Sequence, residues 1–480
     1  MIELRISKDR EIVFNGDYVN TNVLIATIEE HQAQIPLLQK LENYYKGEQD
    51  IKNRTKSNQY CANSRGVFNN ARNIVDTAHS YVFGNPVIYE TDNEELIDNL
   101  TRIGEDAHNN EMGLDMGIFG KAYELLYGDI TEDNTPIIAL KNLSPLNTFI
   151  VYDCDIKQTP LYAVYYYPVY DLDGDILKYK ILVYTDNYIF NYEAKDLDNG
   201  YTLISEEPHL FKALPILEVD NNRYEEGDFY QVIDILDAYN ILMNDRINDK
   251  EQLVDALLVV SGISFGDTDA EAGAEIKRLF DEKVLELPEG ANANFISNAL
   301  NETQIEILRK ALLDDMHKIT KIPNMSDENF ANNVSGIAMS YKLLGFEQLG
   351  KQKELKFIDL LRRRLRLMNN VLGLKGKGFD VNSISIKMYR TLPVNLTDKL
   401  QELQGTDGVL SLQTRLTRYD SELDVERELE LIREEKANNA QMMANAYGDY
   451  NFKANQQLDK LTAEDVREYN KDEEEEQPTK

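Results

Sequence analysis

Two stretches of helical periodicity, separated by a proline and a run of short polar residues, constrain the fold of this chain most. The first covers residues 301–321, where apolar side chains recur every three or four positions (Ile305, Leu308, Leu312, Met316 and Ile319). This spacing is typical of an amphipathic helix. Pro323 predicts its end, because proline disfavours helical geometry in the preceding residue and has no N–H to donate. Helical spacing resumes at Gly336 and continues to about Leu372. We therefore expect two consecutive helices joined by a polar loop over residues 322–335.

A further long helix is predicted over residues 228–257, where apolar side chains again form one stripe. Arg246 and Lys250 interrupt the stripe at its middle, where the core of an isolated monomer disfavours charge. About 30 residues at 1.5 Å each give a rod of about 45 Å. The pattern favours packing against a neighbouring molecule or an exposed stem.

The rest of the chain predicts an α+β protein with several domains, because 480 residues exceed what one hydrophobic core usually holds. We expect helices over residues 23–45, 69–84, 113–127 and 396–438. Short strands are expected at 87–89 and 383–389, and a tyrosine-rich region of alternating periodicity over 136–219. The stretch 258–298 is expected to form a small α/β insertion, with strands at 258–265, 284–287 and 294–296 around a short helix at 270–280. Residues 471–480 are acidic and of low complexity.

The turn Asp171-Leu-Asp-Gly-Asp175 superficially suggests calcium binding. An EF-hand loop needs glycine at its sixth position and glutamate at its twelfth, whereas here glycine is fourth and the twelfth residue is Leu182. We therefore interpret the segment as the turn of a β-hairpin.

The formal net charge of −33 excludes an avid nucleic-acid binder, because such proteins use lysine and arginine to displace condensed counterions. A conduit along which DNA slides would benefit from weak contact, although the charge also serves solubility alone. The one dense basic cluster contains Arg362, Arg363, Arg364 and Arg366. It favours a contact to acidic groups of another subunit over a contact to DNA, and a solvated helix face is the simplest alternative.

No catalytic, metal or cofactor site is predicted. The five histidines are scattered, no phosphate-binding glycine loop or nucleophile elbow is present, and acidic pairs such as Asp314-Asp315 are expected by chance among 84 carboxylates. No apolar run is long enough to span a membrane, the N-terminus lacks the apolar stretch of a signal peptide, and two cysteines imply no disulfide framework.

Five segments, in order, carry a resemblance to a known family. They are the helix–Gly–Asn–Pro–strand stretch 69–89, Gly120 to Leu126, residues 222–249, Pro323 to Phe330 (PNMSDENF) and Ser335 to Gln348 (SGIAMSYKLLGFEQ). Together they resemble the portal proteins of tailed bacteriophages, in the branch of long-tailed phages of Gram-positive hosts. The resemblance covers roughly residues 20–400, and the C-terminal part shows little beyond helicity and acidity.

The resemblance implies the portal fold: a wing (1–227 and 336–394), a stem of two long helices (228–257 and 301–321), an α/β clip (258–300), a tunnel loop (322–335) and a helical crown with an acidic tail (395–480). It further implies a homo-oligomeric ring of twelve subunits at one capsid vertex in the virion, assembled in the host cytoplasm and traversed by double-stranded DNA. The implied partners are the terminase large subunit, the major capsid and scaffolding proteins, and the head-completion or tail connector protein, with no membrane and no cofactor.

The resemblance also assigns roles to residues. The DNA-facing tunnel loop would comprise Asn324, Met325, Ser326, Asp327, Glu328, Asn329, Phe330, Asn332, Asn333 and Ser335. Lys310, Asp314, His317 and Lys321 would face the channel from the stem. Asp267, Asp269 and Glu271 in the clip would dock the terminase or connector, and Arg246, Lys250 and the Arg362–Arg366 cluster would contact other subunits. The alternatives are a metal-dependent phosphodiesterase whose acidic clusters hold Mg²⁺, and a virion scaffold protein that forms no ring.

Overall fold

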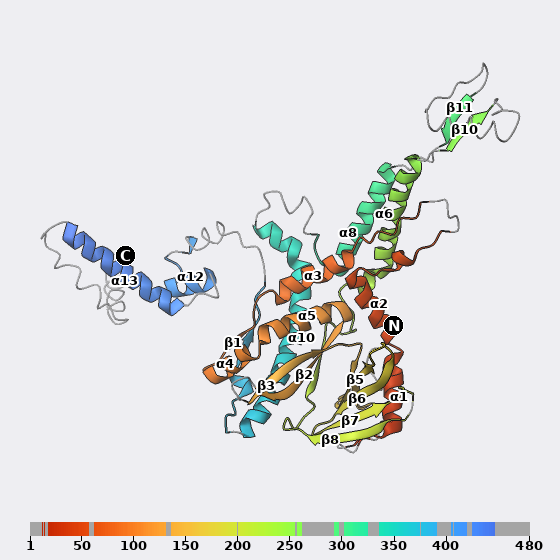
Figure 1. The fold of residues 1–480 in the computed structure, drawn as a ribbon. Helices are drawn as coiled ribbons and strands as arrows, with labels where there is room; N and C mark the ends of the chain where they lie inside the picture. Colours follow the sequence, from red (N-terminus) through yellow and green to blue (C-terminus); the bar gives the residue numbers. More distant parts are fainter. Residues whose placement is uncertain are drawn as a thin grey trace, which may run out of the picture. The chain divides into compact units, whose positions relative to one another are not determined.

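The computed structural model describes residues 12, 14, 18–56, 62–130, 136–198, 200–254, 257–261, 292–296, 302–324, 336–374, 376–390, 405–406, 408–419 and 425–446. The chain forms two compact units, residues 1–392 and 393–480, which are treated separately below. Both helices and sheets are present, and the predicted mixed α and β character is confirmed (Figure 1).

A five-stranded antiparallel sheet occupies the tyrosine-rich region, with strand order β4-β5-β6-β7-β8. Its strands are β4 (Thr148–Tyr152), β5 (Pro160–Tyr170), β6 (Ile176–Tyr184), β7 (Tyr188–Ala194) and β8 (Thr202–Pro208). Helix α1 (Thr21–Gln32) packs Leu24 and Ile28 onto one face, against Phe149 and Val164. The predicted hairpin turn at 171–175 is confirmed, because it joins the antiparallel strands β5 and β6.

A second antiparallel sheet, of order β3-β2-β9, packs against helices and forms the largest core. It contains β2 (Lys121–Ile130), β3 (Pro136–Leu143) and β9 (Ile216–Asp220). Helices α2 (Ile35–Lys46), α3 (Asn70–Phe83), α4 (Glu94–Arg102), α5 (Glu105–Phe119) and α10 (Gly336–Leu374) contribute buried side chains to this core. A two-stranded antiparallel ladder joins β1 (Ile88–Glu90) to β12 (Ser385–Lys387), which brings the segment after α10 beside the segment after α3.

Two helix predictions are wrong in their boundaries. The helix expected over 23–45 is two helices, α1 and α2, because the chain turns at Ala33-Gln34 and Pro36 stands in the first turn of α2. The helix expected over 113–127 begins earlier, at Glu105, and ends at Phe119, after which β2 begins. Gly120 ends it with φ of 85°, a left-handed conformation that glycine adopts without strain.

The two predicted stem helices are confirmed as elements. Helix α6 (Ile233–Val254), preceded by the 3₁₀ turn η2 (Tyr230–Val232), packs against α8 (Glu302–Thr320) (Figure 1). Between them in the sequence, β10 (Leu257–Ser261) and β11 (Asn292–Ile296) pair antiparallel. The other expected elements of the insertion, over 262–291, lie outside the described residues.

The long helix predicted over 336–372 is confirmed as α10, which begins at Gly336 and ends at Leu374. Two 3₁₀ turns, η1 (Asp50–Asn53) and η3 (Val381–Ser383), complete the described part of the first unit. In the second unit the described elements are helical, as predicted: α12 (Leu412–Tyr419) and α13 (Val425–Ala446).

Candidate functional site

The stem pair, α6 with α8, is joined by ion pairs between the two helices. Arg246 contacts Glu302 at 2.9 Å and Glu306 at 3.1 Å, and Lys250 contacts Glu302 at 2.5 Å. The two charges that interrupt the apolar stripe of α6 therefore have partners in the same chain. Their position is explained without a neighbouring subunit, and their role as subunit contacts stays a prediction.

The outer face of α8 carries both charges and large apolar side chains. Lys310, Asp314 and Lys321 are exposed, whereas His317 is half-buried. The apolar stripe predicted for this helix is only partly right: Ile305 and Met316 are buried, but Leu308 is 49% and Ile319 44% exposed, as is Ile307 at 66%. Leu312, which belongs to the predicted stripe, and its neighbour Leu313 are half-buried and pack against the main core. That Lys310, Asp314, His317 and Lys321 face a channel stays a prediction.

The exit of α8 is shaped by a histidine cap. His317 Nδ1 donates a hydrogen bond to the carbonyl oxygen of Ile322 at 2.8 Å, which fixes the first residues after the helix. Lys321 adopts φ of 60°, which is uncommon for a residue with a side chain. Ile322 is buried and anchors this turn in the core. The chain that enters the predicted tunnel loop is therefore held firmly at its first residues.

Most of the predicted loop and clip residues lie outside the part of the chain that the structure describes. Asn324 is half-buried at the start of the loop. The remaining predicted loop residues lie outside the described residues: Met325, Ser326, Asp327, Glu328, Asn329, Phe330, Asn332, Asn333 and Ser335. The predicted docking residues of the clip, Asp267, Asp269 and Glu271, also lie outside them.

A row of buried asparagines on α6, which sequence reasoning missed, holds an extended segment against the stem. Asn240, Asn244 and Asn248 recur every four residues on one face of the helix. Asn240 Oδ1 accepts from the backbone amide of Phe68 at 2.9 Å, and Asn248 Oδ1 accepts from that of Ser64 at 2.6 Å. Asn244 Oδ1 accepts a hydrogen bond from the backbone amide of Gly66 at 2.7 Å, and Asn244 Nδ2 donates one to the carbonyl oxygen of Gly66 at 2.7 Å. The spacing of amide side chains at positions i, i+4 and i+8 is the sequence signal that could have identified this row.

The start of the stem is packed tightly onto the end of α5, which was also missed. A Cβ atom on Gly120 would lie 2.0 Å from the carbonyl oxygen of Glu225, and one on Gly227 would lie 2.4 Å from that of Ile118. Only glycine fits such close backbone approach. The next residue, Asp228, pairs with Lys353 of α10 at 2.7 Å, with both side chains buried. The first turn of the stem is therefore fixed to α5 and α10 together.

The arginine cluster of α10 is divided by burial. Arg364 is fully buried, and its guanidinium contacts Glu124 through Nε at 3.0 Å and Nη2 at 2.6 Å, and Glu105 through Nη1 at 2.7 Å. Burial opposes ionisation of Glu124, but the charge of Arg364 and hydrogen bonds from His108 and Arg364 outweigh it and hold the pKa of Glu124 at about 2. The prediction that Arg364 contacts another subunit is therefore wrong, because its side chain is enclosed in the core of its own chain.

The other three arginines are not enclosed in this way. Arg362 is half-buried, and Arg363 donates through Nη2 to the carbonyl oxygen of Glu218 at 2.8 Å while its Nε pairs with Asp359 at 3.1 Å. Arg366 is exposed. Their role as subunit contacts stays a prediction.

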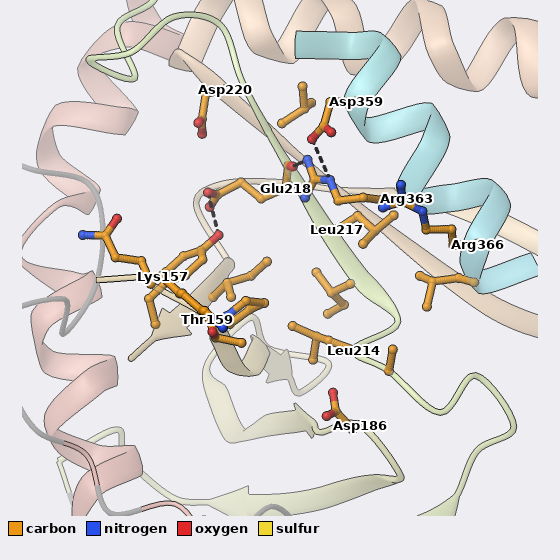
Figure 2. A pocket seen from close by; sticks show the side chains of 18 of the residues that line it. Lys157, Thr159, Asp186, Leu214, Leu217, Glu218, Asp220, Asp359, Arg363 and Arg366 are labelled. Carbon is orange, nitrogen blue, oxygen red and sulfur yellow. Dashed lines mark hydrogen bonds and ion pairs between the residues drawn. The ribbon is translucent and has the colours of Figure 1, made fainter. Parts of the chain in front are cut away.

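Arg363 and Arg366 line a pocket of about 840 Å³ between α10, β9 and the start of β5 (Figure 2). Its apolar lining includes Leu214, Ile216, Leu217 and Leu367. Its carboxylates are engaged locally: Asp359 with Arg363, Asp220 with Lys356 at 3.3 Å, Glu218 with the hydroxyl of Tyr152 at 2.9 Å, and Asp186 with the backbone of Leu214. Burial raises the pKa of Glu218.

No group of three or more His, Cys, Asp or Glu side chains in the described ranges is arranged to hold a metal ion. Within the same ranges, no helix combines the length and apolar character needed to cross a membrane.

Comparison with known proteins places the chain beside phage portal proteins. Residues 26–442 match the family model described as phage portal protein, SPP1 Gp6-like. The portal protein of Bacillus phage SPP1 is 24% identical over 465 residues, covering 90% of this chain and 89% of that protein. The portal protein of Clostridium phage phiCD119 is 23% identical over 439 residues, covering 85% of this chain and 94% of that protein.

Among solved structures, a chain in the neck of a native GTA particle computed with C12 symmetry is 14% identical, with 73% of this chain and 88% of that chain covered. The TM-score is 0.39.

Proposed function

Because the chain belongs to the SPP1 Gp6-like family of phage portal proteins, we propose that it forms a closed ring of twelve subunits at one capsid vertex, with a central channel for double-stranded DNA. Portal proteins are structural components of the virion and not enzymes. The alternative of a metal-dependent phosphodiesterase is therefore wrong.

The stem pair is the observation that carries this proposal. Its two helices are joined by three interhelical ion pairs, while the outer face of α8 exposes Ile307, Leu308 and Ile319 among charged side chains. Large apolar side chains gathered on an exposed face favour a surface that becomes covered in an assembly. A head-to-tail interface between identical subunits closes into a ring when its rotation permits.

The charge of the chain supports a conduit in which DNA moves without strong attachment. A net charge of −33 leaves few basic groups to release counterions from the duplex. In this proposal Lys310, Asp314, His317 and Lys321 face the channel, and the loop 322–335 forms its narrowest collar. Amide and hydroxyl side chains of the loop would contact phosphates weakly, while Asp327 and Glu328 would repel them.

The proposed partners follow from the same assignment to the portal family. The clip, through Asp267, Asp269 and Glu271, would dock the terminase large subunit during packaging and the head-completion or tail connector protein afterwards. The major capsid and scaffolding proteins would surround the ring, which assembles in the host cytoplasm and remains in the virion.

Electron microscopy and mass measurement of the purified protein test the proposal. We expect rings with a central hole that form without any cofactor, and weak binding of linear duplex DNA at physiological salt. Monomers alone across a broad range of concentration and salt would contradict it. Defined assemblies without a central hole would favour the scaffold alternative, and sub-micromolar DNA binding with a steep salt dependence would refute the conduit.

A further inference from the structure

The turn between β5 and β6, residues 170–177, is an exposed apolar and acidic projection, here called the hairpin tip. Its four large apolar side chains are all exposed: Tyr170 by 58%, Leu172 by 106%, Ile176 by 47% and Leu177 by 59%. Three aspartates alternate with them at 171, 173 and 175. None of these carboxylates makes an ion pair with a basic side chain in the part of the chain that the structure describes. The tip thus combines a net charge of three negative units with apolar surface.

The hairpin tip is also preorganised. Asp171 Oδ1 accepts hydrogen bonds from the backbone amides of Asp173 at 3.0 Å and Asp175 at 2.9 Å, and Gly174 takes the left-handed conformation with φ of 89°. The Asp171 amide donates to the Asp175 carbonyl oxygen at 2.9 Å. A turn held in this way loses little conformational freedom when it binds a partner.

The pocket under α10 has the complementary character. Its apolar lining is flanked by Lys157, from the β4–β5 turn, and Arg366, from α10, whose labels stand on opposite sides of the pocket in Figure 2. Both side chains are exposed, and neither has an acidic partner among the described residues. The other two basic side chains of the lining, Lys356 and Arg363, are already paired with aspartates. Asp186 and Glu218 line the same pocket without an ion pair among the described residues, so the match is local. The two unpaired cations, beside an apolar surface, suit an apolar tip that carries unpaired carboxylates.

The tip and the pocket lie at opposite ends of one strand. Pro160, the first residue of β5, lines the pocket, and Tyr170, its last residue, begins the tip. Ten steps of about 3.3 Å separate them by roughly 33 Å. The tip therefore cannot enter the pocket of its own chain, and a second copy of the chain is the molecule that carries the matching surface.

We propose that the hairpin tip of one subunit inserts into the pocket under α10 of its neighbour, so that Asp171, Asp173 and Asp175 meet Lys157 and Arg366. The contact joins two different surfaces of identical chains, which is the kind of interface that propagates around a closed ring. It rests on the proposed ring and names one of the contacts that closes it.

Disulfide cross-linking tests this contact directly. In a background with Cys61→Ser and Cys154→Ser, Leu172→Cys is combined with Thr159→Cys, which lines the pocket. Leu172 is fully exposed, so its replacement leaves the fold intact. Oxidation of assembled protein should give a ladder of covalent multimers, because each subunit carries both halves of the contact. Either cysteine alone should give no covalent dimer, and the matched pair Leu355→Cys with Thr159→Cys, using an exposed site on α10, should give no ladder.

A charge exchange gives an independent measure. Arg366→Glu should raise the protein concentration at which half the chains are in rings by roughly tenfold, and Asp173→Arg should do the same. The double variant should recover most of the loss. Rings that form normally in the cysteine-free background but show no ladder in the double-cysteine variant, or additive charge effects, would overturn this contact and leave the proposed function standing. A background that forms no rings would overturn the proposed function itself.

Discussion

Lys353, in the middle of α10, and Asp228, at the start of the predicted stem, form an ion pair that is closed off from solvent. Nζ of Lys353 lies 2.7 Å from Oδ2 of Asp228, and the side chains are 1% and 2% exposed. Asp228 also accepts from the Asn221 side chain at 3.0 Å, and its backbone amide donates to the carbonyl of Gly117. The helix that follows the predicted tunnel loop is thereby joined to the first turn of the stem.

Replacing Lys353 with methionine should lower the free energy of unfolding by about 3–5 kcal/mol, because it leaves a buried carboxylate without its counter-charge. Denaturant unfolding at fixed protein concentration measures the change. The matched control is Lys52→Met, which removes an exposed pair with Glu48 and should cost less than about 1 kcal/mol. Equal losses in the two variants would show that the buried pair has no special role.

Asn244→Ala should detach the segment around Gly66 from the stem. The substitution removes the two hydrogen bonds that Asn244 makes with the amide and the carbonyl of Gly66, an exposed residue, and each such bond contributes about 0.5–1.5 kcal/mol to stability. Tryptic cleavage after the exposed Arg65 should become faster. Asn382→Ala, at an exposed position, serves as the control and should change neither the stability nor the cleavage rate. Unchanged cleavage in Asn244→Ala would mean that other contacts hold the segment.

The Arg364–Glu124 pair predicts an acid-dependent loss of stability. The folded-state pKa of Glu124, about 2, is below the ordinary value of 4.5. A carboxylate with a depressed pKa stabilises the fold above its unfolded pKa, and the contribution, roughly 3 kcal/mol here, is lost as the pH falls from 4.5 to 2. In Arg364→Met, burial would still oppose ionisation of Glu124, and the hydrogen bond from His108 would be left to counter it without the charge of Arg364. The difference in stability between wild type and this variant should therefore shrink on acidification, and a pH-independent difference would contradict the assignment.

Arg246→Ala with Lys250→Ala distinguishes the two roles considered for these residues. Their pairs with Glu302 and Glu306 are partly exposed, so the loss in stability of a single subunit should stay within about 1 kcal/mol for each pair. If the residues also contact neighbouring subunits, as predicted, the fraction of protein in rings should fall well beyond what that loss explains. Mass photometry at matched concentrations measures it, and an unchanged ring fraction would restrict both residues to their intrachain role.

Asp327→Lys with Glu328→Lys should slow or stall DNA packaging while leaving ring assembly unchanged. The two substitutions place two lysines in the predicted loop of each subunit, which attract phosphate instead of repelling it. In vitro packaging with purified rings measures the rate. The exposed pair Glu94→Lys with Asp98→Lys on α4 controls for the change in net charge. Full heads at normal rates would show that the loop does not meet DNA.

The sequence by itself determined the elements whose periodic pattern extends over many residues and depends only on near neighbours. The stem helices α6 and α8, the long helix α10 and the β5–β6 hairpin follow from apolar spacing, proline and turn residues, because those signals depend on neighbours a few positions away. Membership of the portal family could also be inferred from the sequence, because each of its motifs is a contiguous stretch. The boundary between α5 and β2 could not be inferred from the sequence, because Gly120 ends the helix in a conformation that its close packing against residue 225 requires.

Only the tertiary structure decided which charges are surface and which are core. Arg362, Arg363, Arg364 and Arg366 are the same type of residue on one helix, yet only Arg364 is enclosed. Its partners, Glu105 and Glu124, are more than 200 positions away in the sequence. Lys353 and Asp228, 125 positions apart, also meet only in the folded chain, and so do the segments that form the pocket between α10, β9 and β5. Burial and ion pairing depend on which distant segments come into contact, and a local pattern of charges does not specify those contacts.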